Sequence, residues 1–258
     1  AAAYGAALTG TRAHDPRRFP LLFKVIDARD RLSVQVHPHA ENAGRTGGEP
    51  KTEMWVVLDR APGASLYAGL AEGATPDSLR RALAEGTAAS LLVERPVEPG
   101  QALFIPGGLV HAIGAGCLIY EVQQNSNTTY RLFDWNRVGS DGQPRALHVE
   151  ESFKTIDWSL PAPQMIAPDG RDEADAGWSD VVACDFFKVR RLALQDPLDV
   201  AVDGSSFHAL FVTAGAVTLS VGGERVPLRA GQSALVPADA GVYRLEPDAA
   251  ARLLVTTL

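Results

Sequence analysis

Short apolar runs separated by turn residues dominate the chain. Most runs are bounded by Gly, Pro or Asp, and this density of short strands is typical of a β-sandwich or barrel. The expected strands are 21–26, 32–36, 53–58, 65–70, 102–106, 117–123 and 129–135, followed by 187–194, 208–214, 217–223, 232–238 and 252–258. The pattern therefore predicts an all-β fold.

Two stretches have a helical pattern instead. Residues 76–86 begin with Pro76 and Asp77 and end at Gly86, which are typical helix boundary residues. Residues 148–156 form a second, shorter candidate. We therefore expect a few short helices among the strands.

A stretch rich in Pro, Gly and acidic residues divides the chain at 159–180. It lacks periodicity, which indicates a linker between domains 1–158 and 181–258. The two parts share a pattern, because Gly100 and Pro106 enclose five residues, as do Gly231 and Pro237. Such a repeat predicts two copies of one β-barrel module.

The first copy of this repeat carries a histidine. Residues 100–111 read G-QALFI-P-GG-LV-H and resemble the second cupin motif, which places its histidine, here His111, inside a jelly-roll barrel. The equivalent position of the second copy is Val242, which offers no ligand atom. We therefore expect one metal site, in the first domain.

Two further strands supply polar side chains to the same interior. Ser33, Gln35 and His37 are spaced by two, so they share one face of a strand, and Lys51 and Glu53 do the same on another. Burying such groups is costly unless a cation compensates them. The imidazoles of His37 and His111, the carboxylate of Glu53 and the amide oxygen of Gln35 form a nitrogen and oxygen ligand set. This set suits Zn²⁺, with Mn²⁺, Co²⁺ or Fe²⁺ as substitutes.

Each residue taken alone also has an ordinary explanation. A lone histidine such as His37 is more often a surface or core residue than a ligand. The ordinary explanation for Glu53 is an ion pair with Lys51 on a solvated strand face. His39 is interpreted as lying in the loop beside the site. The remaining histidines, which have no comparable context, are interpreted as structural: His14, His148 and His208.

Composition narrows the possible partners and location. A net charge of −7 argues against nucleic acid as the main partner, although a small anionic substrate remains possible. No stretch approaches the roughly 20 apolar residues of a membrane span. Two cysteines are too few for a disulfide scaffold, and the Ala-rich start lacks the features of a signal peptide. These observations favour a cytoplasmic protein that binds neither nucleic acid nor membranes.

The chain resembles the short bacterial form of type I mannose-6-phosphate isomerases. The motifs that carry the resemblance are FPLLFKVIDA (19–28), LSVQVHP (32–38), KTEMW (51–55), IPGGLVHAIG (105–114), EVQQNSNTTYRLFDWNR (121–137) and ALHVEESFKTID (146–157). Family members carry a further N-terminal β region before the point where this chain starts, which leaves open whether the short start marks a fragment, a processed form or the native chain. This chain also differs in the loop after His37 and Pro38 from those relatives that have a lysine there.

The resemblance implies a ligand set and an activity. Its zinc ligands would be Gln35, His37, Glu53 and His111, and its active-site arginine would be Arg131. The implied reaction interconverts mannose 6-phosphate and fructose 6-phosphate through an enediolate.

Further residues have implied roles in this reaction. Lys51 and Glu121 compete for the role of proton-transferring base, and Lys51 is also a candidate for binding substrate. Arg131 would bind the oxyanion or the phosphate, and Ser33 is a phosphate candidate.

Two other functions use the same residues. A cupin oxygenase would hold Fe²⁺ in this ligand set, although Gln35 stands where such sites usually have histidine. A non-catalytic cupin would bind sugar phosphate without converting it. Dependence on O₂ and turnover of mannose 6-phosphate distinguish these possibilities from an isomerase.

Overall fold

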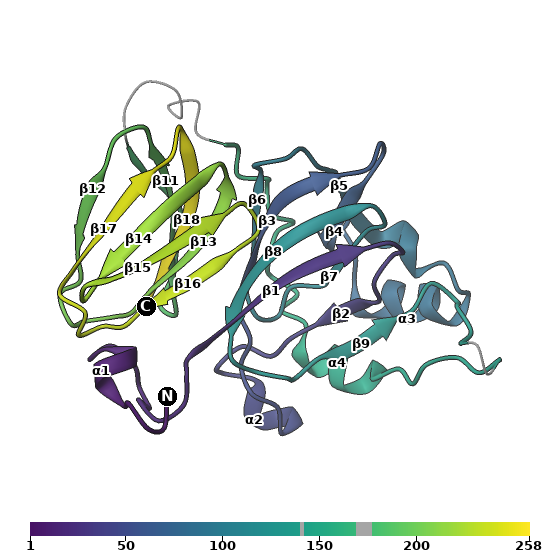
Figure 1. Cartoon of the computed structure of the whole chain (residues 1–258). Helices are drawn as coiled ribbons and strands as arrows, with labels where there is room; N and C mark the ends of the chain where they lie inside the picture. The colour runs from purple at the N-terminus through teal and green to yellow at the C-terminus, as the bar shows by residue number, and fades with distance from the viewer. Residues whose placement is uncertain (140–141, 169–176) are drawn as a thin grey trace. The chain divides into compact units, whose positions relative to one another are not determined.

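The computed structural model describes residues 1–139, 142–168 and 177–258. These residues form two compact units: the first unit is Leu21–Ala167, and the second unit is Ala1–Pro20 with Pro168–Leu258. Both consist mainly of antiparallel strands (Figure 1). The predicted all-β fold with a few short helices is confirmed. In the described residues, no helix is long and apolar enough to cross a membrane.

Two sheets make up the first unit. The four-stranded sheet has the order β1 (Leu21–Ala28), β8 (Cys117–Gln124), β3 (Glu53–Arg60) and β6 (Ala102–Ile105). The five-stranded sheet has the order β5 (Leu92–Pro96), β4 (Ser65–Leu70), β7 (His111–Ile113), β2 (Val34–Val36) and β9 (Tyr130–Phe133). The short helices are α2 (Ala43–Thr46), α3 (Pro76–Ala84) and α4 (Val149–Thr155), with a 3₁₀ helix at Ala88–Leu91.

Alternation along the strands gives the five-stranded sheet two apolar faces. Leu66 faces the interior of the barrel and packs in one buried cluster with Trp55 and Ile119 of the other sheet. The opposite face carries a second cluster, in which Val36 and Leu132 pack with residues of α3 and α4. Residues two apart on a strand share a face, so polar residues at interior positions must lie among the apolar ones.

Local capping fixes α3 close to its predicted bounds. Thr75 precedes the helix and accepts a hydrogen bond from the Ser78 amide at 3.2 Å, while the Ser78 hydroxyl accepts one from the Thr75 amide at 2.8 Å. Pro76 occupies the first turn, where its missing N–H costs nothing. Gly86 follows the helix with a φ of +70°, a conformation that favours glycine.

The second unit repeats the two-sheet plan. One sheet has the order β10 (Trp178–Ala183), β11 (Lys188–Leu194), β18 (Ala251–Thr257), β13 (His208–Ala214) and β16 (Ser233–Val236). The other has the order β12 (Leu198–Ala201), β17 (Val242–Pro247), β14 (Ala216–Val221) and β15 (Glu224–Arg229). Their facing side chains form one core, which includes Leu210, Leu219, Tyr243 and Leu253.

The Gly–Pro repeat has the same structure in both units. Gly100 and Gly231 have φ values of +85° and +86°, and each precedes an edge strand, β6 or β16. The Gly100 amide donates to the Val57 carbonyl at 2.8 Å, and the Gly231 amide donates to the Val212 carbonyl at 2.8 Å. The repeat read from the sequence therefore corresponds to a repeated turn and strand.

The units divide at positions other than the expected ones. The 1–20 segment, which contains α1 (Ala6–Thr9), belongs to the second unit, because the Ala238 amide donates to the Leu8 carbonyl at 3.1 Å. Gly10 approaches the same unit so closely that a Cβ there would lie 2.3 Å from the Ser205 oxygen. Within the expected linker, Ile166 forms a bridge with Ala102 of the first unit. The linker residues 169–176 lie outside the described part.

Candidate metal centre

Three predicted ligands meet inside the first unit. His37 directly follows β2, whereas Glu53 and His111 begin β3 and β7. Their ligand atoms all lie within 4.8 Å of one another, and the three side chains are fully buried. Nε2 of His37 lies 3.2 Å from Nε2 of His111, and the Glu53 carboxylate oxygens lie 3.3 Å from the His111 Nε2 and 3.5 Å from the His37 Nε2.

Main-chain carbonyls fix the tautomer of both histidines. Nδ1 of His37 lies 2.9 Å from the Thr128 carbonyl oxygen, and Nδ1 of His111 lies 2.8 Å from that of Leu109. A carbonyl only accepts, so each Nδ1 carries the proton and each Nε2 presents a lone pair to the centre. Burial lowers the pKa of both imidazoles, against the opposing attraction of Glu53, and they are therefore neutral.

The Glu53 carboxylate stays ionised although it is completely buried. Burial opposes ionisation, but attraction to Lys51 and then to the histidines lowers the pKa of Glu53 to about 2. The Lys51 Nζ lies 2.7 Å from the Glu53 Oε2 and 3.0 Å from the His37 Nε2. Within the described residues, the Lys51 ion pair is the contact of the Glu53 carboxylate with a cation.

This arrangement fits a divalent metal ion. Two Nε2 lone pairs and a buried carboxylate converge, and they would repel one another without a cation. Imidazole nitrogens with a carboxylate oxygen are ligands of Zn²⁺ and related ions. His37, Glu53 and His111 therefore form a candidate metal-binding triad.

Gln35 lies next to these residues in the sheet. On β2 it pairs with His111 of β7 on one side and with Arg131 of β9 on the other. Register partners share a face of the sheet, so Gln35 and Arg131 belong to the interior face that carries His111. Gln35 stays a predicted fourth ligand.

A second polar group occupies the interior face of the four-stranded sheet. Glu121 of β8 pairs with Lys24 of β1 and Trp55 of β3, and Nζ of Lys24 lies 2.5 Å from the Glu121 Oε2 and also contacts Gln123. The Trp55 Nε1 donates to the Glu121 Oε1 at 3.1 Å. Burial, with the negative charge of Glu53, raises the pKa of Glu121.

Lys24 is an interior residue that our sequence reasoning missed. Its signal is present in the sequence, because Lys24 is a lone charge within the apolar run LLFKVI of 21–26. A charged residue at an interior position of such a strand requires a partner inside the barrel. The structure supplies this partner as Glu121.

Arg131 is held beside Ser33 and apart from any carboxylate in the described residues. Its Nε donates to the Ser33 hydroxyl at 3.3 Å, and its Nη1 donates to the Ala146 carbonyl at 2.8 Å. The main-chain amide of Arg131 donates to the His148 ring Nδ1 at 3.2 Å, and the His148 main-chain amide donates to the Arg131 carbonyl at 2.7 Å. Arg131 and Ser33 are thus brought together, and His148 has a structural role at this point.

The glycines of the cupin motif allow the turn before His111 to approach the His37 segment. A Cβ on Gly107 would lie 2.6 Å from the Pro38 oxygen and 2.8 Å from the His39 Cα. The Gly108 amide donates to the His37 carbonyl at 2.7 Å. The motif therefore positions one ligand against the next through backbone contact.

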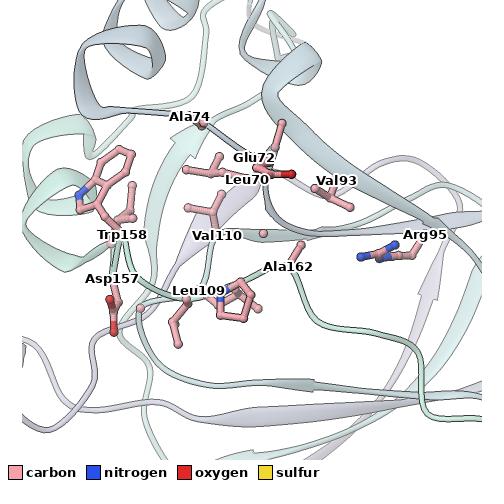
Figure 2. Close-up of a pocket in the computed structure, with 17 residues that line it drawn as sticks. Leu70, Glu72, Ala74, Val93, Arg95, Leu109, Val110, Asp157, Trp158 and Ala162 are labelled. Carbon is pink, nitrogen blue, oxygen red and sulfur yellow. The ribbon is translucent and has the colours of Figure 1, made fainter.

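A cavity of about 520 Å³ lies elsewhere in the first unit. Figure 2 shows its apolar middle, formed by Leu109, Val110 and Ala162, between Trp158 on one side and Arg95 on the other. The Arg95 Nε donates to the Pro163 carbonyl at 3.2 Å. None of the metal residues lines this cavity, so it is distinct from the metal centre.

Known proteins resemble the chain in both sequence and structure. The type I phosphomannose isomerase catalytic domain family matches residues 3–59, and the mannose-6-phosphate isomerase cupin domain family matches residues 179–256. A mannose-6-phosphate isomerase of Streptococcus mutans is 34% identical over 234 residues, 89% of this chain and 72% of that protein. The Bacillus subtilis enzyme ManA is 34% identical over 232 residues, with the same two coverages.

The crystal structure of a mannose 6-phosphate isomerase from Bacillus subtilis has the same architecture. It superimposes with a TM-score of 0.80 at 26% identity, over 94% of this chain and 76% of that one. The sequence and structural likenesses therefore agree.

Proposed function

We propose that this chain, which belongs to the type I mannose-6-phosphate isomerase family, interconverts mannose 6-phosphate and fructose 6-phosphate in the barrel of its first unit. The observation that carries the proposal is the convergence of His37, Glu53 and His111, with Lys51 in direct contact. A sugar isomerase needs a site that stabilises negative charge beside a group that moves protons. The first unit offers both.

The metal ion would be held by the three converging residues and Gln35, and we propose zinc. A bound divalent cation supplies a Lewis acid that polarises the substrate's oxygens. The buried carboxylate of Glu53 supports a metal at this position, because its oxygens lie 3.3 Å from the His111 Nε2 and 3.5 Å from the His37 Nε2, beside the Lys51 ion pair.

Proton transfer between C1 and C2 requires a base next to the sugar. The base removes the proton from C2 of the aldose, an enediolate forms across C1 and C2, and the proton is delivered to C1, while the hydroxyl proton of O2 passes to O1 so that the carbonyl moves to C2. Lys51 and Glu121 are the candidates. Both Glu121 oxygens already accept bonds from Lys24 and Trp55, and the Lys51 Nζ already contacts Glu53 and His37, so both residues remain candidates for this role.

Arg131 and Ser33 would bind the substrate. The contacts of the Arg131 guanidinium among the described residues are a hydroxyl and a carbonyl rather than an acid. An uncompensated cation at the barrel interior suits the developing oxyanion or the phosphate group. The Ser33 hydroxyl, which accepts from Arg131, would orient the guanidinium and share the same anion.

A coupled assay tests the proposal. Purified, zinc-loaded protein is given mannose 6-phosphate, and fructose 6-phosphate formation is followed with and without a chelator. We expect turnover that the chelator abolishes and added zinc restores. His37→Gln should lose metal and turnover, whereas His39→Gln, a matched change outside the ligand cluster, should keep both.

Two results would contradict this function. Zinc-loaded protein that binds mannose 6-phosphate without converting it would indicate a sugar-phosphate-binding cupin. Turnover that requires O₂ would indicate an oxygenase.

A further inference from the structure

The register of the second barrel shows which of its residues correspond to the metal centre. Glu53 pairs with Ile105, the residue before the motif proline of the first unit, and His208 pairs with Val236, the residue before that proline in the second. His208 therefore occupies the position of Glu53. Our sequence reasoning treated His208 as merely structural, because this equivalence appears only when the strands are paired.

Neighbouring strands extend the correspondence. Arg190 pairs with Val255 as Lys24 pairs with Glu121, so Arg190 stands where the first barrel has Lys24.

The remaining ligand positions follow from the strand that begins at Val242. Val242 occupies the position of His111 and pairs with Ala201, as His111 pairs with Gln35. Asp203, two residues after Ala201, takes the place of His37. The second barrel thus keeps interior polar residues but not the ligand set, and among the described residues the metal-binding cluster of the first unit has no counterpart there.

A cavity of about 430 Å³ opens at these positions. Its lining includes Arg190, His208, Asp203 and Ala201, together with Arg12 and Trp178. The mouth of the second barrel therefore lacks the ligand set found in the first barrel, yet apolar side chains do not fill it. Its volume lies within the range of small-molecule pockets, roughly 300–1,000 Å³.

Two hydrogen-bond donors at this mouth lack acceptors in the described part of the chain. The Arg190 guanidinium stacks 4.0 Å from the centroid of the Trp178 ring and forms neither a hydrogen bond nor an ion pair there. The His208 Nδ1 lies 3.0 Å from the Tyr243 hydroxyl. Burial raises the pKa of Tyr243, so its hydroxyl keeps its proton and can donate this bond, in which case His208 carries its N–H at Nε2.

Charged groups of both signs line the mouth. Arg12 is exposed, and its main-chain amide donates to the Ser205 carbonyl at 3.0 Å, which anchors the residue at the rim. Of the two acids that line the cavity, Asp199 is paired with Arg244 at 2.9 Å through both oxygens. Asp203, which accepts a bond from the Ser205 amide at 2.8 Å, is the other acidic side chain of the lining, beside Arg12 and Arg190.

We propose that the mouth of the second barrel is a metal-independent binding site for a small anionic metabolite, whose phosphate or carboxylate group is held by Arg190 and His208. A guanidinium and an imidazole N–H are donors that suit both kinds of oxyanion. Trp178, already stacked on Arg190, would flank the rest of the ligand. This site is separate from the isomerase site of the first unit.

Tryptophan NMR of the full chain tests this proposal. The chain has four tryptophans, and Trp178 is the one in the second unit, whereas Trp55 reports on the metal centre. Inorganic phosphate and acetate are titrated separately at constant ionic strength, and the indole N–H resonance of Trp178, assigned with Trp178→Phe, is followed. We expect a saturable shift, and the anion that binds more tightly identifies the group.

Three variants complete the test. Arg190→Gln should weaken binding at Trp178 by roughly 10-fold to 100-fold, the usual value of a hydrogen bond to a charged group. Arg12→Gln, at an exposed rim position that does not endanger folding, should weaken it less. Arg229→Gln is the matched control, because Arg229 is exposed on β15 and does not line the cavity.

Several results would overturn the proposal. They are an unmoved or non-saturating Trp178 resonance with both anions, saturation seen at Trp55 alone, and equal effects of Arg190→Gln and Arg229→Gln. The Trp178 titration of the unaltered protein and of Arg12→Gln remains decisive even if Arg190→Gln does not fold.

Discussion

Replacing Asp134 with Asn should destabilise the first unit in a pH-dependent way. Asp134 follows β9, and both of its oxygens are held by arginines. Arg145 donates to Oδ1 at 2.5 Å and to Oδ2 at 2.8 Å, and Arg137 donates to Oδ1 at 2.6 Å. The next two residues, Trp135 and Asn136, have φ values of +56° and +57°, a conformation that costs energy in residues other than glycine. The two ion pairs therefore stabilise a strained turn three residues after Arg131.

The pKa of Asp134 sets the magnitude. The hydrogen bond from Arg145 is the largest cause; burial opposes it, and the hydrogen bond from Arg137 with the charges of both arginines adds to it, which lowers the pKa of Asp134 from 3.8 to about 2. One pKa unit corresponds to about 1.4 kcal/mol, so the lowered value represents about 2.5 kcal/mol at most. The side chains of Arg137 and Arg145 are 30% and 48% exposed, and solvent screening reduces the contribution to about 1–2 kcal/mol.

The sign of the pH dependence follows from the direction of the shift. The folded state has the lower pKa, so the stabilisation is complete above the unfolded pKa of about 4 and disappears as the pH falls through about 2. At pH 3 roughly half of it should remain. Urea unfolding of the unaltered protein and Asp134→Asn, followed by tryptophan fluorescence from pH 7 downward, measures the difference.

A surface ion pair provides the control. Glu98→Gln removes the partner of Arg60, in a pair whose carboxylate is 62% exposed, and should change stability much less than Asp134→Asn. The reasoning would be refuted by an Asp134→Asn variant as stable as the unaltered protein at pH 7. A difference that stays constant down to pH 3 would refute it as well.

Three further predictions concern the first barrel. Arg131→Ala should retain one metal ion, measured by metal analysis, yet lower kcat about 100-fold to 1,000-fold, and near-normal activity would remove Arg131 from the mechanism. Gly107→Ala should lower the free energy of unfolding by about 1–3 kcal/mol, because its Cβ would meet the Pro38 oxygen at 2.6 Å, and an unchanged urea midpoint would contradict this. Zinc at about a thousandfold excess over its Kd should stabilise the chelator-treated protein by about 4 kcal/mol, seen as a raised Tm. Glu53→Gln should abolish this gain, whereas Glu98→Gln should keep it.

The strand pattern alone predicted most of the β fold. Long strands with apolar residues, such as β3, β8 and β13, were visible because each must bury at least one face. Six strands were missed: β5, β7, β10, β12, β15 and β17. Several are short or lie at a sheet edge, and β15 has five exposed or charged positions in six, so they owe their strand conformation to neighbours rather than to their own pattern.

The sequence by itself also indicated the three residues of the candidate metal-binding triad, for a local reason. His37 and Glu53 were found from the two-residue period of a strand, and His111 from a motif whose glycines are required by a close backbone approach. These signals are contained within a few consecutive residues.

Only the tertiary structure decided what lies across from each residue. Lys24 and Glu121 are 97 positions apart and meet because β1 and β8 pair, and the equivalence of His208 with Glu53 depends on the register of β13 against β16. The assignment of residues 1–20 to the second unit likewise rests on hydrogen bonds to residues more than 190 positions away. Such contacts depend on strand register and chain crossing, which the local period of a sequence does not encode.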